Sequence, residues 1–273
     1  MKNPPLVPLY TYLLFVLLCG CVQQLPSPSG STDREGESQH NNELLIALYA
    51  GEGTWEDSVT ACEAMFMWMG YPVIHVDARD ILAHILDETA LLCIPGGDMY
   101  QYAQDLTPEG MDLIREFIQN GGGYLGICGG AYLAADTIMW KGRHLSMTSL
   151  SLFSGTAEGP LSSIAMYPDY GMCTIICEDP WVCNPDPAVM LYYGGPGFII
   201  EEASGVNICG RYEQGGLPAI LFFAFGRGHV FLIGTHPEIE EDSDRDGVLF
   251  GDEFDDDGTD WELMKSVIVL CIP

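Results

Sequence analysis

The sequence predicts an α/β fold in which a mostly parallel sheet is followed by a β-rich second half. Short apolar runs alternate with stretches of helical periodicity in the first part of the chain. Glycine-rich turns follow several of the apolar runs, a pattern typical of buried parallel strands. After about residue 150, glycine, proline and aromatic residues divide the chain into short β-like segments. Together these observations favour one α/β domain over residues 44–273.

The elements of the first half can be assigned in order. Continuous apolar runs predict four strands, at 44–50, 72–76, 90–94 and 124–127. Helical spacing of apolar residues predicts three helices between them, at 56–69, 78–86 and 108–119. The third helix is predicted to open at Thr107-Pro108, because proline is favoured at the first helical position.

The second half contains two recognisable elements. The apolar segments 219–225 and 229–234 flank Gly226-Arg227-Gly228, which predicts a β-hairpin. Thr259 and Glu262 have the spacing of a capping box and predict a final helix through about Leu270.

Composition limits the classes of partner. The 273 residues include 10 lysines and arginines against 39 aspartates and glutamates, a formal net charge of −29. With 48% hydrophobic and 18% charged residues the chain can bury a large core, which excludes global disorder. So large an acidic excess repels phosphate groups, and no basic tract occurs. We therefore expect no nucleic acid partner.

The N-terminus has the features of an export signal. Lys2 precedes an apolar run over residues 9–22, which at about 14 residues is short for a membrane span. The run ends in Leu18-Cys19-Gly20-Cys21, which resembles the lipobox of prokaryotic lipoproteins. We expect a lipoprotein-type signal peptide at 1–21, lipidation at Cys21 and a flexible tether at 22–43. The alternative is a retained membrane anchor. Both interpretations place the domain outside the cytoplasm, at the membrane surface of the cell envelope.

Export permits disulfides, and cysteines at positions 173, 177 and 183 cluster in a loop-like stretch where one could form. Their connectivity cannot be deduced from the sequence.

Cys128 is the candidate nucleophile. It lies in Gly126-Ile127-Cys128-Gly129-Gly130, where a strand is predicted to pass into a helix. A nucleophile at such a turn is exposed above the sheet edge, and small neighbours are needed because side chains would collide there. The start of the following helix also favours a thiolate. The alternative is a buried structural cysteine in a glycine-rich strand end.

A thiol nucleophile needs a histidine, and the histidine needs an orienting carboxylate. His236 follows an apolar strand and precedes Pro237-Glu238. Alternation along an extended chain would place His236 and Glu238 on the same side. The alternative is a surface histidine followed by one more acid in an acidic segment.

These motifs resemble the class I glutamine amidotransferase-like superfamily. The resemblance rests on Pro95-Gly96-Gly97, the Gly126–Gly130 elbow and His236-Pro237-Glu238, in that order. Tyr192-Tyr193-Gly194-Gly195-Pro196 and the stretch 218–230 resemble more narrowly the family named for the biotin-protein ligase N-terminal domain. The resemblance implies a flavodoxin-like sheet with helices on both faces and a triad of Cys128, His236 and Glu238. It also implies an oxyanion hole formed by the backbone N–H groups of Gly97 and Gly129.

The resemblance does not extend to every motif. Working glutamine amidotransferases usually carry a glutamine shortly after the nucleophile, whereas this chain continues Ala131-Tyr132-Leu133. We therefore expect an exported, membrane-tethered cysteine hydrolase acting on a small amide or peptide, with no organic cofactor. The alternatives are a catalytically silent, calcium-stabilised binding lipoprotein and amidotransfer with a separate synthetase, against which the signal sequence counts.

An acidic segment after the expected triad matches a twelve-residue, EF-hand-like calcium loop at 242–253, with Gly247 at its sharp turn. The expected calcium ligands are the side chains of Asp242, Asp244, Asp246 and Glu253 and the carbonyl of Val248. The alternative is a solvated acidic loop in an acidic protein. The sequence thus predicts a single structural calcium site.

Overall fold

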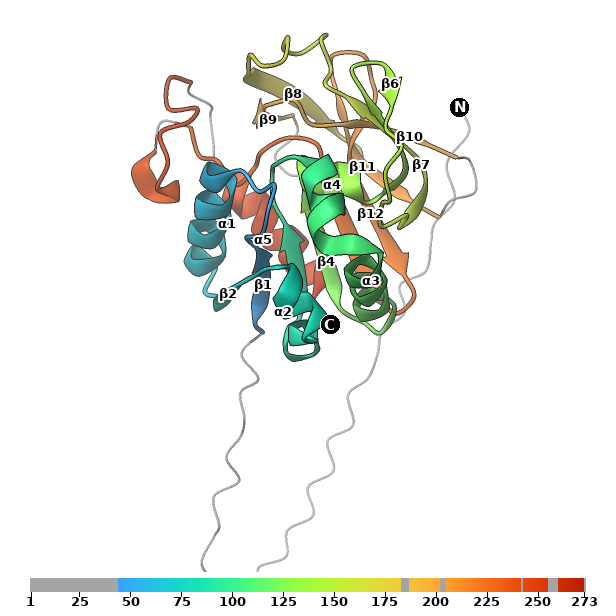
Figure 1. Cartoon of the computed structure of the whole chain (residues 1–273). Coiled ribbons are helices and arrows are strands. Elements are labelled where there is room, and N and C mark those ends of the chain that lie inside the picture. The colour runs from blue at the N-terminus through green and yellow to red at the C-terminus, as the bar shows by residue number, and fades with distance from the viewer. Residues whose placement is uncertain (1–43, 183–186, 202–204, 242, 255–259, 273) are drawn as a thin grey trace, which may run out of the picture. The chain divides into compact units, whose positions relative to one another are not determined.

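The computed structural model describes residues 44–182, 187–201, 205–241, 243–254 and 260–272. Its main feature is a nine-stranded sheet with the strand order β2-β1-β3-β4-β13-β12-β11-β8-β9. A separate four-stranded sheet has the order β10-β7-β5-β6. The α/β fold class and the β-rich second half predicted from the sequence are confirmed (Figure 1).

Five neighbouring strands of the main sheet are parallel. They are β2 (Val73–Val76), β1 (Ile46–Tyr49), β3 (Leu91–Ile94), β4 (Gly123–Ile127) and β13 (Gly228–Ile233). The first four match the predicted strands. β1, β3 and β4 are apolar runs buried on both faces of the sheet, whereas the edge strand β2 is half-buried at Val73 and Ile74 and exposed at His75. β13 pairs with β4 in a register that sets Ile233 opposite Ile127, so both strands end at the same edge.

The remaining strands of the main sheet are antiparallel. They are β12 (Pro218–Phe225), β11 (Asn207–Tyr212), β8 (Gly171–Cys177) and β9 (Ala188–Tyr192). The pairing of β12 with β13 confirms the predicted hairpin. The sheet is therefore mixed, with its parallel part carrying the predicted elbow.

Helices cover both faces of the sheet, as expected (Figure 1). α1 (Glu56–Trp68) and α5 (Asp260–Cys271) pack against one face. α2 (Ala78–Leu82) and α3 (Met99–Gln119) pack against the other. A short helix, α4 (Gly129–Leu133), follows β4 directly.

One predicted helix boundary was wrong, and one helical segment was not predicted. The helix expected at 78–86 ends at Leu82, because His84 adopts a left-handed conformation with φ of 64°; a 3-10 turn, η1 (Ile85–Glu88), follows. α3 consists of two helical segments that meet at Thr107, and the second is the helix predicted at 108–119. The first segment, from Met99, was not predicted; the carboxylate of Asp98 accepts hydrogen bonds from its first turn. Thr107 is non-helical and marks a kink where the sequence predicted the start.

The second sheet was not predicted as a separate unit. It consists of β5 (Ala135–Trp140), β6 (Arg143–His144), β7 (Phe153–Gly159) and β10 (Gly197–Ile200). β5 starts two residues after α4 ends, so this sheet is connected directly to the elbow helix. It lies beside the carboxyl ends of the parallel strands in Figure 1.

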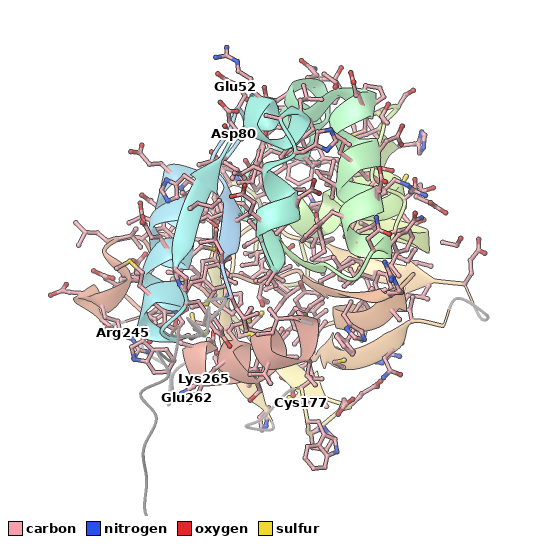
Figure 2. All side chains as sticks on the ribbon, turned by 90° about the horizontal axis from the view of Figure 1, so that it is seen from below. Glu52, Asp80, Cys177, Arg245, Glu262 and Lys265 are labelled. Carbon is pink, nitrogen blue, oxygen red and sulfur yellow. The ribbon has the colours of Figure 1, made fainter. Side chains whose placement is uncertain are left out.

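The start of α5 is joined to α1 through aromatic rings and cations. The rings of Trp68 and Trp261 have centroids 5.7 Å apart. Arg245, from the short helix η2 (Asp244–Asp246), lies 4.4 Å from the Trp261 centroid, and Lys265 lies 5.3 Å from that of Trp68. Figure 2 shows Arg245 and Lys265 near one another on this face. Two of the few cations in the chain thus hold the acidic segment against α1 and α5.

The expected features before residue 44, including Cys21, lie outside the described residues. Within the described ranges, no helix has both the length and the apolar character that a membrane span requires. Cys177, labelled in Figure 2, is disulfide-bonded, and its partner lies outside the described residues. Cys173, the other described member of the predicted cluster, is a free buried thiol.

Candidate active site

Cys128 lies in strained backbone between β4 and α4. Its φ of 46° and ψ of −98° are an uncommon combination for any residue with a side chain. Its N–H donates to the carbonyl of Ile233, which ties the turn to the end of β13. A Cβ at Gly130 would lie 2.0 Å from the carbonyl oxygen of Ile94, so only glycine fits there. The local sequence is therefore what allows this cysteine to project from the sheet edge.

The two glycines of the expected oxyanion hole lie against one another. A Cβ at Gly129 would stand 2.4 Å from the carbonyl oxygen and 2.8 Å from the nitrogen of Gly97. In the part of the chain that the structure describes, neither Gly97 N–H nor Gly129 N–H donates to a protein acceptor. Two donors are thus available beside Cys128, as stabilisation of an oxyanion requires.

His236 and Glu238 form a buried pair. The distance from His236 Nδ1 to Glu238 Oε1 is 2.8 Å, and both side chains are fully buried. The expectation that an extended chain brings them together was wrong. The segment is a turn in which Ile239 N–H donates to the His236 carbonyl at 3.3 Å, and Pro237 lies within it.

Ser58 is a member of the site that the sequence analysis missed. Its Oγ donates to Glu238 Oε1 at 2.5 Å and accepts from Gly96 N–H at 2.8 Å. It therefore links the loop carrying Gly97 to the carboxylate. The sequence feature that could have indicated this role is a small polar residue on the buried face of α1, one helical turn before Cys62.

The groups around the imidazole of His236 favour its protonated form. Burial lowers the pKa of His236, but the charges of Glu238 and Cys128 outweigh this effect and raise the pKa to about 10. Its second nitrogen, Nε2, is buried and has no hydrogen-bond partner among the described residues. Cys128 Sγ donates instead to the carbonyl of Tyr193, at 3.6 Å. The structure thus brings the three expected triad residues together.

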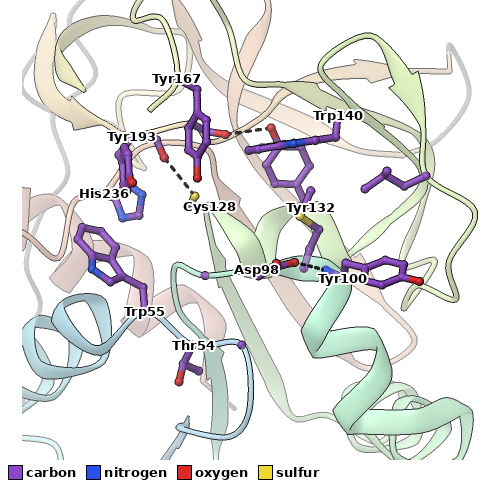
Figure 3. A pocket seen from close by; sticks show the side chains of 15 residues that line it. Thr54, Trp55, Asp98, Tyr100, Cys128, Tyr132, Trp140, Tyr167, Tyr193 and His236 are labelled. Atoms are coloured by element: carbon purple, nitrogen blue, oxygen red, sulfur yellow. Dashed lines mark hydrogen bonds between the residues drawn. The ribbon is translucent and has the colours of Figure 1, made fainter. Parts of the chain in front are cut away.

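A cavity of about 640 Å³ opens above Cys128 and His236. Figure 3 shows His236 and Trp55 on one side of Cys128, and Tyr132 and Trp140 on the other. Tyr193 follows β9 and Trp140 ends β5, so both sheets contribute to the walls. These aromatic residues were not predicted, because they come from separate segments.

The predicted calcium loop has a definite arrangement in its described part. Asp246 is buried and accepts hydrogen bonds from the N–H groups of Glu240 and Val248, at 2.9 and 3.1 Å. Glu253 accepts one from the hydroxyl of Tyr170 at 2.6 Å. Among the described residues no group of three or more acidic, histidine or cysteine side chains is gathered as a metal site would need. Asp242, the first expected ligand, lies outside the described residues, and the calcium site stays a prediction.

A mixed α/β sheet with a cysteine elbow at one strand end and a His–Glu pair after the neighbouring strand is an arrangement of the glutamine amidotransferase-like fold. Within that class, the family model described as "Biotin-protein ligase, N terminal" matches residues 44–248. The chain belongs to this family.

Two relatives match part of this chain. The chain is 29% identical over 161 residues to the biotin–protein ligase of Schizosaccharomyces pombe, covering 55% of this chain and 26% of that protein. It is 31% identical over 159 residues to an uncharacterized protein of Chlamydia muridarum, covering 56% of this chain and 61% of that protein. The chain thus spans about a quarter and three fifths of these two relatives.

Solved structures share the fold at low identity. A glutamine amidotransferase from Thermotoga maritima has a TM-score of 0.52 and 13% identity, over 83% of this chain and 96% of that one. A ThuA-like protein from Bacteroides uniformis has a TM-score of 0.51 and 13% identity, over 83% and 90%. At this identity the similarity establishes the fold alone.

Proposed function

We propose that the protein is an exported, membrane-tethered cysteine hydrolase that cleaves an amide or peptide through Cys128, His236 and Glu238. The observation that carries this proposal is the strained Cys128 facing the cavity beside a fully buried His236–Glu238 pair. Strain of this kind persists only where the surrounding structure enforces it, and it clusters at functional sites.

In the proposed first half-reaction the thiolate of Cys128 attacks the substrate carbonyl carbon. The N–H groups of Gly97 and Gly129 stabilise the oxyanion. When the tetrahedral intermediate collapses, the carbon–nitrogen bond breaks and the amine leaves with a proton from His236. A raised His236 pKa supports this role, because the imidazole is protonated at neutral pH.

In the second half-reaction the neutral imidazole takes a proton from water, and the hydroxide attacks the thioester carbonyl. The carbon–sulfur bond then breaks, the carboxylic acid product leaves and the thiolate–imidazolium pair is restored. Glu238 holds the imidazole through Nδ1 in both steps, and the distance of 2.8 Å supports that role.

The test is hydrolysis of a panel of N-acyl aminomethylcoumarin amides, with ammonia release from glutamine measured alongside. Cys128→Ser is expected to lose more than about a thousandfold in turnover, and intact mass spectrometry of the wild type to show an acyl adduct on Cys128. Cys209→Ala is the matched control, since it removes a free thiol that does not line the cavity. Turnover that survives in Cys128→Ser refutes the proposal.

One observation favours a second candidate, a catalytically silent binding protein. Cys128 Sγ donates a hydrogen bond to the carbonyl of Tyr193 at 3.6 Å, a contact that the proposed attack does not use. A binder would keep its ligand in Cys128→Ser, whereas the hydrolase would lose turnover.

The tether is proposed on separate grounds. The family match begins at residue 44, so the apolar run and Cys21 precede the matched domain. Lipidation at Cys21 would place the domain at the membrane surface. Incorporation of radiolabelled palmitate that is lost in Cys21→Ala is the expected result; equal labelling of both proteins contradicts it.

A further inference from the structure

The cavity above Cys128 is lined largely by aromatic side chains. Six of them line it, from six different places in the chain: Trp55, Tyr100, Tyr132, Trp140, Tyr167 and Tyr193. Most are half-buried rather than buried, so their rings present apolar surface to the cavity. A ligand that covers these rings removes that surface from water.

Five of the six rings, all except that of Tyr100, contact one another in a continuous wall. Tyr167 and Tyr193 are stacked, with centroids 5.6 Å apart and an interplanar angle of 19°. Trp140 meets Tyr167 edge-on at 5.2 Å, and Trp55 meets Tyr193 edge-on at 5.4 Å. Because each of these rings is held by its neighbour, the binding of a flat group costs little side-chain conformational entropy.

The same cavity offers little to an anion. No lysine or arginine is among the described residues that line it. Lys141 lies nearby, but its ammonium group is 4.7 Å from the Tyr167 ring centroid and it does not line the cavity. The positive end of α3 is already occupied by the carboxylate of Asp98, the only acidic residue in the lining. The cationic group in the described lining is the imidazole of His236, which lies beside Cys128. A ligand carboxylate held away from the reacting carbonyl would therefore be desolvated without a partner.

We infer that the substrate is an amide whose acyl group is uncharged and carries a planar ring, and not glutamine or another group with a free α-carboxylate. This inference rests on the proposed function, since it assigns the substrate class of that same site. The aromatic wall would hold the ring, and the donors of Gly97 and Gly129 would receive the carbonyl oxygen.

The test is calorimetric binding to the full chain carrying Cys128→Ala, which requires no turnover. Three probes distinguish the effect of a negative charge from that of an aromatic ring: N-acetylphenylalaninamide, N-acetylphenylalanine and N-acetylalaninamide. The neutral aromatic amide is expected to bind at least about tenfold more tightly than either of the others, which is roughly the effect of one well-placed aromatic contact. Equal or tighter binding of the carboxylate or the alanine probe overturns the inference, as does no binding of the aromatic amide up to its solubility limit.

Variants in the wall connect the preference to the cavity. Tyr167→Ala is expected to reduce the preference for the aromatic amide several-fold, and Tyr167→Phe to retain it, because only the first removes the ring. Trp181→Ala is the control, since Trp181 is 84% exposed and does not line the cavity. A preference that survives Tyr167→Ala unchanged in a folded protein overturns the inference.

The two claims fail in distinguishable ways. Selective binding of the aromatic amide with no Cys128-dependent hydrolysis refutes the hydrolase and leaves the ligand class standing. Cys128-dependent hydrolysis with no preference among the three probes refutes the ligand class and leaves the hydrolase standing.

Discussion

Ser58 connects two parts of the site that are far apart in the sequence. Its hydroxyl bonds both to Gly96 N–H and to Glu238 Oε1. The loop that carries Gly97 and the turn that carries Glu238 are therefore positioned relative to one another by a single side chain. Gly96 is equally constrained, because a Cβ there would lie 2.6 Å from His236 Cε1.

We predict that Ser58→Ala destabilises the protein by about 1–3 kcal/mol, the cost of leaving buried polar groups without a partner. It should also slow alkylation of Cys128, because Glu238 loses a donor that fixes it beside His236. Chemical denaturation and the labelling rate are the two measurements.

Two variants identify the role of Ser58 as positioning. Ser58→Thr keeps the hydroxyl and should restore the labelling rate. Thr60→Ala removes an exposed hydroxyl from the same helix and should change neither quantity. Lower stability with an unchanged labelling rate would mean that Ser58 has a structural role only.

At the scale of elements, α5 holds the turn that carries the acid. Trp261, in the first turn of α5, donates from Nε1 to the backbone carbonyl of Glu238 at 2.9 Å. The ring is buried and packs near Trp68 of α1. The indole of Trp261 thereby joins α5 to the turn that carries Glu238.

Trp261→Phe is predicted to lower the free energy of unfolding by about 1–3 kcal/mol, through loss of a buried hydrogen bond and of ring volume. Labelling of Cys128 should also slow, because the turn that carries Glu238 loses its anchor. Trp68→Phe is the control, since it reduces the same aromatic contact but has no bond to Glu238. Equal effects of both variants on labelling would contradict this account.

The acidic segment carries a prediction of its own. If residues 242–253 bind calcium, about 1 mM Ca²⁺ should raise the melting temperature relative to excess chelator, since extracellular calcium modules bind in this range. Asp244→Asn should abolish the increase. An identical melting temperature with calcium and with chelator refutes the calcium site.

The sequence predicted the parallel strands better than the rest of the fold. Continuous apolar runs such as that of β3 indicate burial on both faces without knowledge of any partner. The second sheet could not be assigned, because β5 and β7 mix exposed and buried residues and pair over long sequence separations.

The candidate site was predictable where its chemistry is local. Cys128 has flanking glycines, and His236 and Glu238 are two residues apart, so both were found. Ser58 and the aromatic wall reach the site only through tertiary packing, and no local pattern marks them. The turn at Pro237 shows that a correct pairing can be predicted for a wrong geometric reason.

At the scale of the whole molecule, stability should depend on pH through His236. Its pKa is raised from 6.5 to about 10 in the folded protein, so the native state binds the extra proton. The resulting stabilisation is complete below pH 6.5 and is lost as the pH rises to about 10. Burial also raises the pKa of thiols such as that of Cys209, to about 12. These thiols reduce the free energy of unfolding only above pH 9.0, the ordinary pKa of a thiol.

We therefore predict that the free energy of unfolding declines between pH 6.5 and 9 and that His236→Gln flattens this decline. Denaturant titrations across this range give the slope, and His229→Gln is the control, because its imidazole lies far along β13 from the site. A slope shared by both variants and the wild type would contradict the raised pKa of His236.

The central proposal is that Cys128 is the nucleophile of a triad with His236 and Glu238, and the alkylation rate of Cys128 against pH tests it most directly. Mass spectrometry of the iodoacetamide-treated protein reads the site of labelling. We predict fast labelling that persists below about pH 7 and slows in His236→Ala, because the imidazolium stabilises the negative sulfur. Labelling that is slow at neutral pH, rises only in alkali and is the same in His236→Ala would contradict the account and favour the binding protein.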